Sequence, residues 1–147
     1  MLRKIMGVVA GIVAAFATIW LVELIGHQIF PVAGNIDLGD RESLTAFMAS
    51  LPVGALLFVV ISWFAGALVG GVVAARITGE RWAAWVVAGV IAFASIANVL
   101  MFPHPLWVKI GGFVAPLLGG WIAARTARPI VVTETAPVHR DAADADV

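Results

Sequence analysis

Four polar side chains that could move a proton or bind a ligand interrupt otherwise apolar sequence: Glu23, His27, Asn98 and His104. Glu23 and His27 stand at the helical spacing i, i+4, so their side chains can meet on one face of a helix. A carboxyl group beside an imidazole can exchange a proton near neutral pH. One carboxylate with two histidines is also a plausible ligand set for a divalent metal or a haem.

Catalytic signatures are missing from the sequence. It contains no nucleophile-elbow motif Gly-x-Ser-x-Gly, no His-Glu-x-x-His metalloprotease motif and no phosphate-binding loop. The chain also has 0 cysteines, which excludes disulfides, thiolate metal ligands and cysteine nucleophiles. We therefore expect a protein without catalytic residues or enzyme activity, and with no cofactor unless the histidines hold one.

The composition places these polar residues in a membrane protein. Apolar residues make up 62% of the chain and charged residues 12%, against roughly 45–50% and ~25% in soluble domains. The 9 basic residues balance the 9 acidic ones, so no net charge would attract nucleic acid. The expected partner is the lipid bilayer.

Four segments are apolar and long enough to cross a hydrocarbon core, which takes about 20 helical residues. Such segments are helical because only a helix satisfies all backbone hydrogen bonds within one span. The uncharged run Ile5–Val22 exceeds the roughly 7–15 apolar residues of a cleaved signal peptide, which favours a retained first span. The sequence thus predicts an all-α integral membrane four-helix bundle within residues 1–128, with spans at about 5–30, 51–75, 82–102 and 105–124.

Charge and aromatic residues predict the orientation. Basic side chains favour the cytoplasmic side of membrane proteins, and tryptophan favours the two interfaces. The side that carries Asp37, Asp40 and Glu42 has few basic residues, Arg41 and Lys109. Both termini are therefore expected in the cytoplasm of a bacterium, with the protein in its inner membrane. The basic residues that flank the cytoplasmic ends are Arg3, Lys4, Arg76, Arg81, Arg125 and Arg128.

We expect a short helix in the outer loop 31–50 and no folded structure in the C-terminal tail 129–147. Within Arg41–Leu51 the residues Leu44, Phe47, Met48 and Leu51 share one helical face, which predicts a short helix on the outer membrane surface. Asp40 is expected to cap this helix, and Ser50 the following span. The polar tail has too little apolar sequence to fold and is expected to be disordered in the cytoplasm.

The first and second halves of the membrane domain resemble each other. Similar runs occur in the first and third spans, and in this register His27 matches His104. The second and fourth spans both end in Gly-Gly-x-x-Ala-Ala-Arg, at Gly70 and Gly119. Shared membrane composition is the simpler explanation, but it does not place a rare histidine in register. We therefore predict a parallel internal repeat of two tandem hairpins related by a pseudo-two-fold axis along the membrane normal.

Small residues recur on one face of every span. Rows of small residues let helix backbones approach closely, which stabilises helix association in lipid. We expect these rows to pack the bundle within one chain, with a homo-oligomer or a membrane-complex partner as the alternative. The rows include Gly7, Gly11, Ala15 and Gly26; Gly66, Gly70 and Ala74; Ala84, Ala88 and Ser95; and Gly111, Ala115, Gly119 and Ala123.

The polar cluster is open to three interpretations. Glu23 lies seven residues before Phe30, about 10 Å below the outer end of its helix, where Asn98 and His104 are expected to join it. In the first interpretation these side chains satisfy one another as a clamp in a non-enzymatic accessory or structural membrane protein. In the second, Glu23 carries the proton in a proton-linked small-solute transporter or channel. In the third, His27, His104 and Glu23 hold a haem or a divalent metal.

Several short motifs resemble those of a family of uncharacterised bacterial four-span integral membrane proteins. They are Glu23-x-x-Gly26-His27-x-x-Phe30-Pro31, the Leu51-Pro52 pair that opens the second span, and Pro103-His104-Pro105-Leu106-Trp107. The resemblance covers roughly residues 5–125. It implies the four-span architecture but no activity, because none is assigned to that family.

Overall fold

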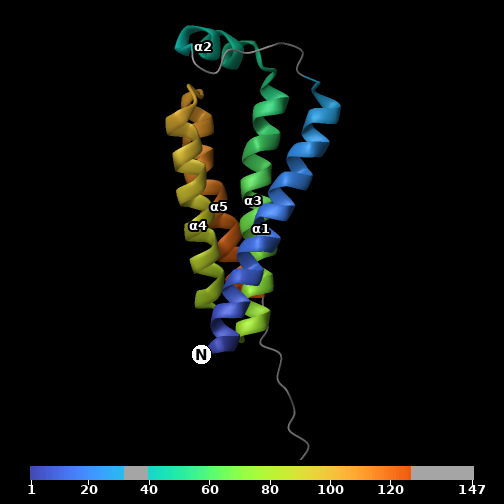
Figure 1. The fold of residues 1–147 in the computed structure, drawn as a ribbon, viewed down its shortest axis with the longest axis vertical. Coiled ribbons are helices and arrows are strands. Elements are labelled where there is room, and N and C mark those ends of the chain that lie inside the picture. The colour runs from blue at the N-terminus through green and yellow to red at the C-terminus, as the bar shows by residue number, and fades with distance from the viewer. Residues whose placement is uncertain (32–39, 127–147) are drawn as a thin grey trace, which may run out of the picture.

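A computed structural model describes residues 1–31 and 40–126 of the chain. Its four long helices are candidate membrane spans by length and composition, and they pack as a bundle (Figure 1). The predicted all-α four-span architecture is confirmed, and the predicted bounds differ from the observed ones by a few residues. The predicted disordered tail 129–147 lies outside the described residues. The helices are α1 (Leu2–Ile29), α2 (Arg41–Ser50), α3 (Val53–Thr78), α4 (Trp82–Met101) and α5 (Leu106–Thr126).

The third helix is the centre of the bundle. α3 packs against α1, α4 and α5, whereas α1 and α5 do not contact each other within the described residues. The predicted repeat pairs α1 with α4 and α3 with α5, so the contact between α3 and α4 should have a counterpart between α5 and α1. That counterpart does not occur in the described part of the chain. The bundle is therefore not symmetric, and the internal repeat stays a prediction.

Small residues bring α1 and α3 into backbone contact. A side-chain Cβ added at Gly11 would lie 2.6 Å from the carbonyl oxygen of Gly70 and 2.6 Å from the Cβ of Ala74. Gly119 of α5 fits against α3 equally closely, since a Cβ there would lie 2.6 Å from the carbonyl oxygen of Phe64. In lipid such close packing supplies much of the association energy between helices. At these glycines the small-residue rows therefore pack helices within one chain, as expected.

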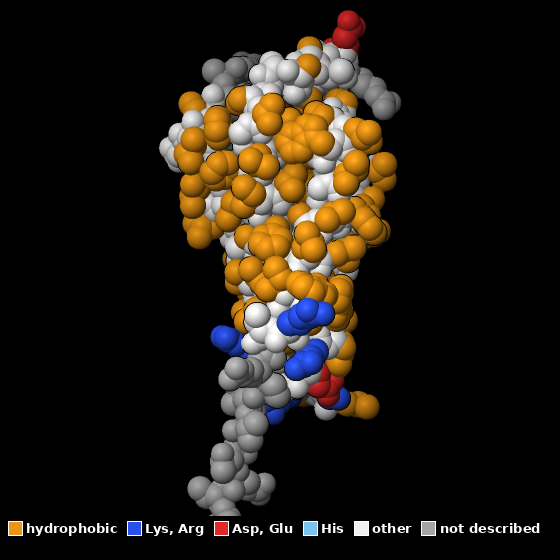
Figure 2. Space-filling model, turned by 180° about the vertical axis from the view of Figure 1, so that it is seen from behind, with side chains coloured by type: hydrophobic (Ala, Val, Ile, Leu, Met, Phe, Trp, Pro, Cys, Tyr) orange, Lys and Arg blue, Asp and Glu red, His pale blue; other side chains and the backbone are white. Residues whose placement is uncertain are grey.

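The end of the bundle that holds the N-terminus is basic and interlinked. Lys4 forms an ion pair with Glu80 at 2.7 Å, and the Nε of Arg3 donates a hydrogen bond to the carbonyl of Ile77 at 2.8 Å. Both contacts join the start of α1 to the end of α3 and the turn beyond it. Gly79 makes that turn possible, because it ends α3 with φ 77°, a conformation that favours glycine. Figure 2 shows Lys and Arg side chains gathered at this end below a broad apolar surface.

The opposite end of the bundle is crossed by α2 (Figure 1). Asp40 caps α2 as predicted, because its carboxylate accepts hydrogen bonds from the backbone N–H groups of Glu42 at 3.2 Å and Ser43 at 3.0 Å. The prediction that Ser50 caps α3 is wrong. Ser50 still belongs to α2 and its hydroxyl donates to the carbonyl of Phe47, so Pro52 is the residue that precedes the first turn of α3.

Replacing Gly11 with alanine should destabilise the bundle, because the new methyl group would collide with the backbone of α3. Overpacking of this kind typically costs about 1–3 kcal/mol. Gly89→Ala is the matched control, since a Cβ at Gly89 has nothing within 4 Å and alanine favours a helix. Thermal unfolding of the detergent-solubilised variants should give a lower Tm for Gly11→Ala and an unchanged or higher Tm for Gly89→Ala. Equal Tm values for the two variants would contradict the close α1–α3 crossing.

Candidate functional site

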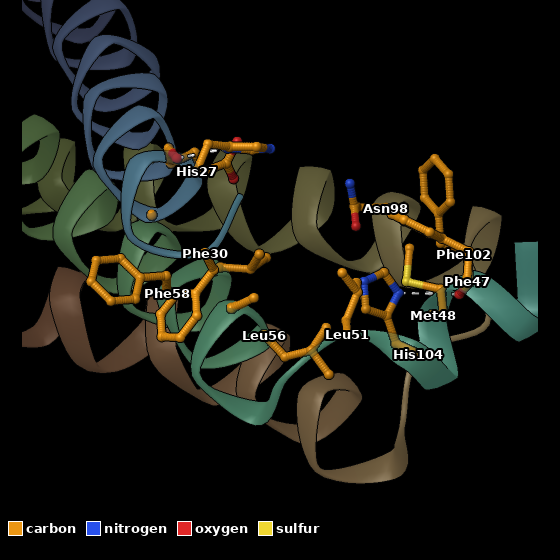
Figure 3. A pocket seen from close by; sticks show the side chains of 14 residues that line it. His27, Phe30, Phe47, Met48, Leu51, Leu56, Phe58, Asn98, Phe102 and His104 are labelled. Carbon is orange, nitrogen blue, oxygen red and sulfur yellow. Dashed lines mark hydrogen bonds between the residues drawn. The ribbon is translucent and has the colours of Figure 1, made fainter. Parts of the chain in front are cut away.

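A cavity of about 380 Å³ lies at the α2 end of the bundle. Its walls come from α1, α3, α4 and the α4–α5 connection, and residues of α2 and its C-terminal end cover it. All four polar residues singled out in the sequence, Glu23, His27, Asn98 and His104, line this one cavity. The remaining lining is apolar apart from one glycine, and includes Phe30, Phe47, Met48, Leu51, Leu56, Phe58 and Phe102 (Figure 3).

The cavity exists because α1 follows α3 but leaves α4. Near the basic end α1 lies close to α4, where a Cβ at Gly11 would be 3.1 Å from Val87. Towards the α2 end α1 leans away from α4 (Figure 1). It remains in contact with α3 there, since a Cβ at Gly26 would lie 3.2 Å from the ring of Phe58. The space between the diverging helices is the cavity.

Glu23 lies half-buried in the α1 wall, and its partner is a hydroxyl group. Ser62 of α3 donates a hydrogen bond to Oε1 of Glu23 at 3.2 Å and shares its single hydroxyl proton with the carbonyl oxygen of Val59 at 2.8 Å. Within residues 1–31 and 40–126 no Lys, Arg or His forms an ion pair with this carboxylate. The predicted hydrogen bond from Asn98 to Glu23 is not observed. Sequence reasoning missed Ser62, because a single hydroxyl residue in an apolar span is common and carries no signal of its own.

His27 is joined to Glu23 through the backbone. Its Nδ1 donates a hydrogen bond to the backbone carbonyl oxygen of Glu23 at 2.7 Å. The sequence predicted a contact between the two side chains instead. The imidazole is exposed, and its Nε2 makes no hydrogen bond within the described residues. His27 and His104 lie on opposite sides of the cavity (Figure 3).

His104 belongs to the connection between α4 and α5 and is buried. Its Nδ1 donates to the carbonyl of Phe102 at 3.1 Å, and the two rings meet edge to face with centroids 6.2 Å apart. Burial lowers the pKa of His104 below its ordinary value; the hydrogen bond to Phe102 opposes this shift, and the nearby positive charge of Lys109 adds to it. The neutral imidazole is therefore favoured at this position.

The proposed metal ligands do not converge. Among the residues that the structure describes, no group of three or more His, Cys, Asp or Glu side chains is arranged to hold a metal ion. The set of Glu23, His27 and His104 is therefore no ready-made metal centre. The arrangement suits the binding of a small molecule instead, because one acid, one amide and two imidazoles line an otherwise apolar cavity.

Comparisons of the chain with protein-family models, curated proteins and solved structures give no match. The four-span architecture implied by the family resemblance is present in the structure, but no family is identified.

The stability of the protein should depend on His104 below neutral pH. Because burial favours the neutral imidazole, the unfolded chain binds a proton more readily as the pH falls below the ordinary value of 6.5. The free energy of unfolding should therefore decrease on acidification from about pH 7.5 to about 5.5. His104→Gln, which cannot titrate, should show a smaller decrease in Tm over this range in detergent.

A parent and a His104→Gln variant with equal pH dependence would show that the imidazole is not held in its neutral form. His139 lies in the polar tail and offers a matched control, because His139→Gln should leave the pH dependence as it is in the parent.

Proposed function

We propose that this chain is a non-enzymatic, multi-pass membrane protein that binds a small molecule in its cavity in exchange for a proton on Glu23. The observation that carries the proposal is a carboxyl group in the cavity wall whose hydrogen-bond partner, Ser62, is uncharged. A carboxylate within a membrane-spanning segment is costly unless it is paired or neutralised. A proton or a bound ligand can neutralise Glu23, and the two then compete for the same group.

The clamp interpretation explains only part of the cluster. The hydrogen bond from Ser62 to Glu23 does link α1 to α3, as a clamp would. However, the rings of His27 and His104 bond to backbone carbonyls nearby in the sequence, and the Asn98 side chain makes no hydrogen bond within the described residues. Polar groups that face a chamber and leave bonding capacity unused favour ligand binding over cross-linking.

A continuous channel fits the geometry poorly, because the basic half of the bundle is tightly packed. Ala15, Val87 and Ile91 are fully buried there, and Gly11 and Gly70 bring the backbones of α1 and α3 together. The cavity thus ends within the bundle. Proton-linked binding with access from the α2 end is the better candidate, and a transport cycle would require α1 and α4 to separate further along their length.

The orientation and the internal repeat belong to the same proposal. We place the basic end, with Arg3, Arg76 and Arg81, on the cytoplasmic side of the bacterial inner membrane, because basic residues favour that side. We also propose that the α1–α3 and α4–α5 hairpins arose by duplication. The matched histidines and Gly-Gly-x-x-Ala-Ala-Arg endings support this, and the asymmetric packing reflects divergence.

Modification of Glu23 by the apolar reagent dicyclohexylcarbodiimide tests whether the carboxyl group is reached through the cavity. The reagent attacks protonated carboxyl groups in apolar surroundings, so Glu23 should react several-fold faster than the exposed Glu42, as measured by mass spectrometry of peptides. Ala55 lines the cavity, and Ala55→Phe should fill part of it and slow the reaction at Glu23 while the reaction at Glu42 is unchanged. Equal rates at both residues, unaffected by Ala55→Phe, would refute the proposal.

The cysteine-free sequence allows a direct test of orientation. Single cysteines introduced as Glu42→Cys and Arg76→Cys would mark the α2 end and the basic end. In intact cells a membrane-impermeant maleimide should label Glu42→Cys, and it should label Arg76→Cys only after the cells are permeabilised. The reverse pattern would overturn the proposed orientation.

A further inference from the structure

We infer that the ligand of the cavity is a small organic cation, an amine or quaternary ammonium group on an apolar body, held between the carboxylate of Glu23 and the Phe30–Phe58 ring pair. This inference rests on the proposed function, because it names the class of molecule that exchanges with the proton.

The charges around the cavity favour a cation. Of the 14 residues that line it, Glu23 is the one Asp, Glu, Lys or Arg. His104 lies on the far wall. Burial and the nearby positive charge of Lys109 lower its pKa by more than the hydrogen bond to Phe102 raises it, so the neutral imidazole is favoured. His27 already donates its Nδ1 proton to a backbone carbonyl. The carboxylate of Glu23 would repel an anionic ligand, and a neutral ligand would leave its negative charge unbalanced. A cationic ligand would form an ion pair with it.

The aromatic residues next to Glu23 favour an organic cation. Phe58 precedes Ser62 by four residues on α3, so its ring lies about one helical turn from the hydroxyl that contacts Glu23. Phe30 of α1 meets Phe58 edge to face, with ring centroids 6.0 Å apart. The face of an aromatic ring attracts a cation, and the attraction is strongest when the cation sheds its water. The acid and the ring pair thus lie together on the α1–α3 side of the cavity.

The rest of the cavity suits an apolar body better than a metal ion. Met48 supplies a polarisable thioether, and Leu51 and Leu56 supply aliphatic surface (Figure 3). Hard metal cations need several oxygen ligands, and the described residues contain no such group of acidic or histidine side chains. A volume of about 380 Å³ is near the lower end of the range for small-molecule sites, which indicates a compact ligand.

Binding of benzyltrimethylammonium to the detergent-solubilised full chain tests the inference. Its neutral carbon isostere, neopentylbenzene, has the same shape without the charge and serves as a competitor. We expect radiolabelled benzyltrimethylammonium to bind, its affinity to fall as the pH is lowered, and neopentylbenzene to compete at least about tenfold more weakly.

Three variants connect this binding to the named residues. Glu23→Gln should weaken binding of benzyltrimethylammonium by about tenfold or more and abolish its pH dependence, and Phe58→Leu should weaken it several-fold because it removes the ring. Glu80→Gln is the matched control, because Glu80 lies at the opposite end of the bundle and pairs with Lys4. It should bind as the parent does. The Tm of each variant, measured in the same detergent, shows whether a loss of binding comes from loss of the fold.

The two proposals can fail separately. If benzyltrimethylammonium does not bind the parent, if neopentylbenzene competes equally well, or if a folded Glu23→Gln variant binds like the parent, the organic-cation assignment is wrong. Rapid carbodiimide modification of Glu23 in the same preparation would then still support proton-linked binding in the cavity. Slow modification that Ala55→Phe does not alter would remove both proposals.

Discussion

The crossing of α1 over α3 at Gly11 and Gly70 is the contact on which the site depends. The absence of side chains at these two positions lets the backbones touch, so that α1 can follow α3 along its length. α1 buries a smaller share of its residues than the other three spans and has α3 as its principal neighbour. A helix held on one side in this way is free to diverge from α4, and the divergence creates a chamber without any break in the spans.

The chemistry of that chamber follows from what surrounds Glu23. A hydroxyl group from Ser62 orients the carboxyl group but supplies no charge, and the cations of the chain are concentrated at the other end of the bundle. The exceptions within the described chain, such as Lys109, do not pair with it. Within the described residues no cation forms an ion pair with Glu23, so a proton or a cation from outside the fold can balance its charge. This property supports the proposed binding site, because a purely structural hydrogen bond would need no ligand.

Much of this architecture could be predicted from the sequence because lipid imposes simple rules. Span length, helical structure, the Asp40 cap and the small-residue faces each follow from local sequence, and the structure bears them out. The four residues of the predicted polar cluster line one cavity, but neither the cavity nor the observed contacts were predicted. Ser62 replaced Asn98 as the partner of Glu23 because α1 packs on α3 and leans away from α4. Which helix neighbours which depends on the fit of whole helix faces, and the pattern within a single span does not contain that information.

The two ends of α1 are held by different kinds of contact, and the geometry of the cavity depends on both. Its N-terminal end is joined to the end of α3 by the hydrogen bond of Arg3 and to the α3–α4 turn by the ion pair of Lys4. At its other end Phe30 packs against Gly54, and Gly26 packs against Phe58. The backbones of α1 and α3 touch at Gly11, and His27 lies about 24 Å further along α1. Over such a length a difference in tilt of about 5° shifts the position of the helix end by about 2 Å. The width of the cavity thus depends on the small angle at which α1 leaves α4.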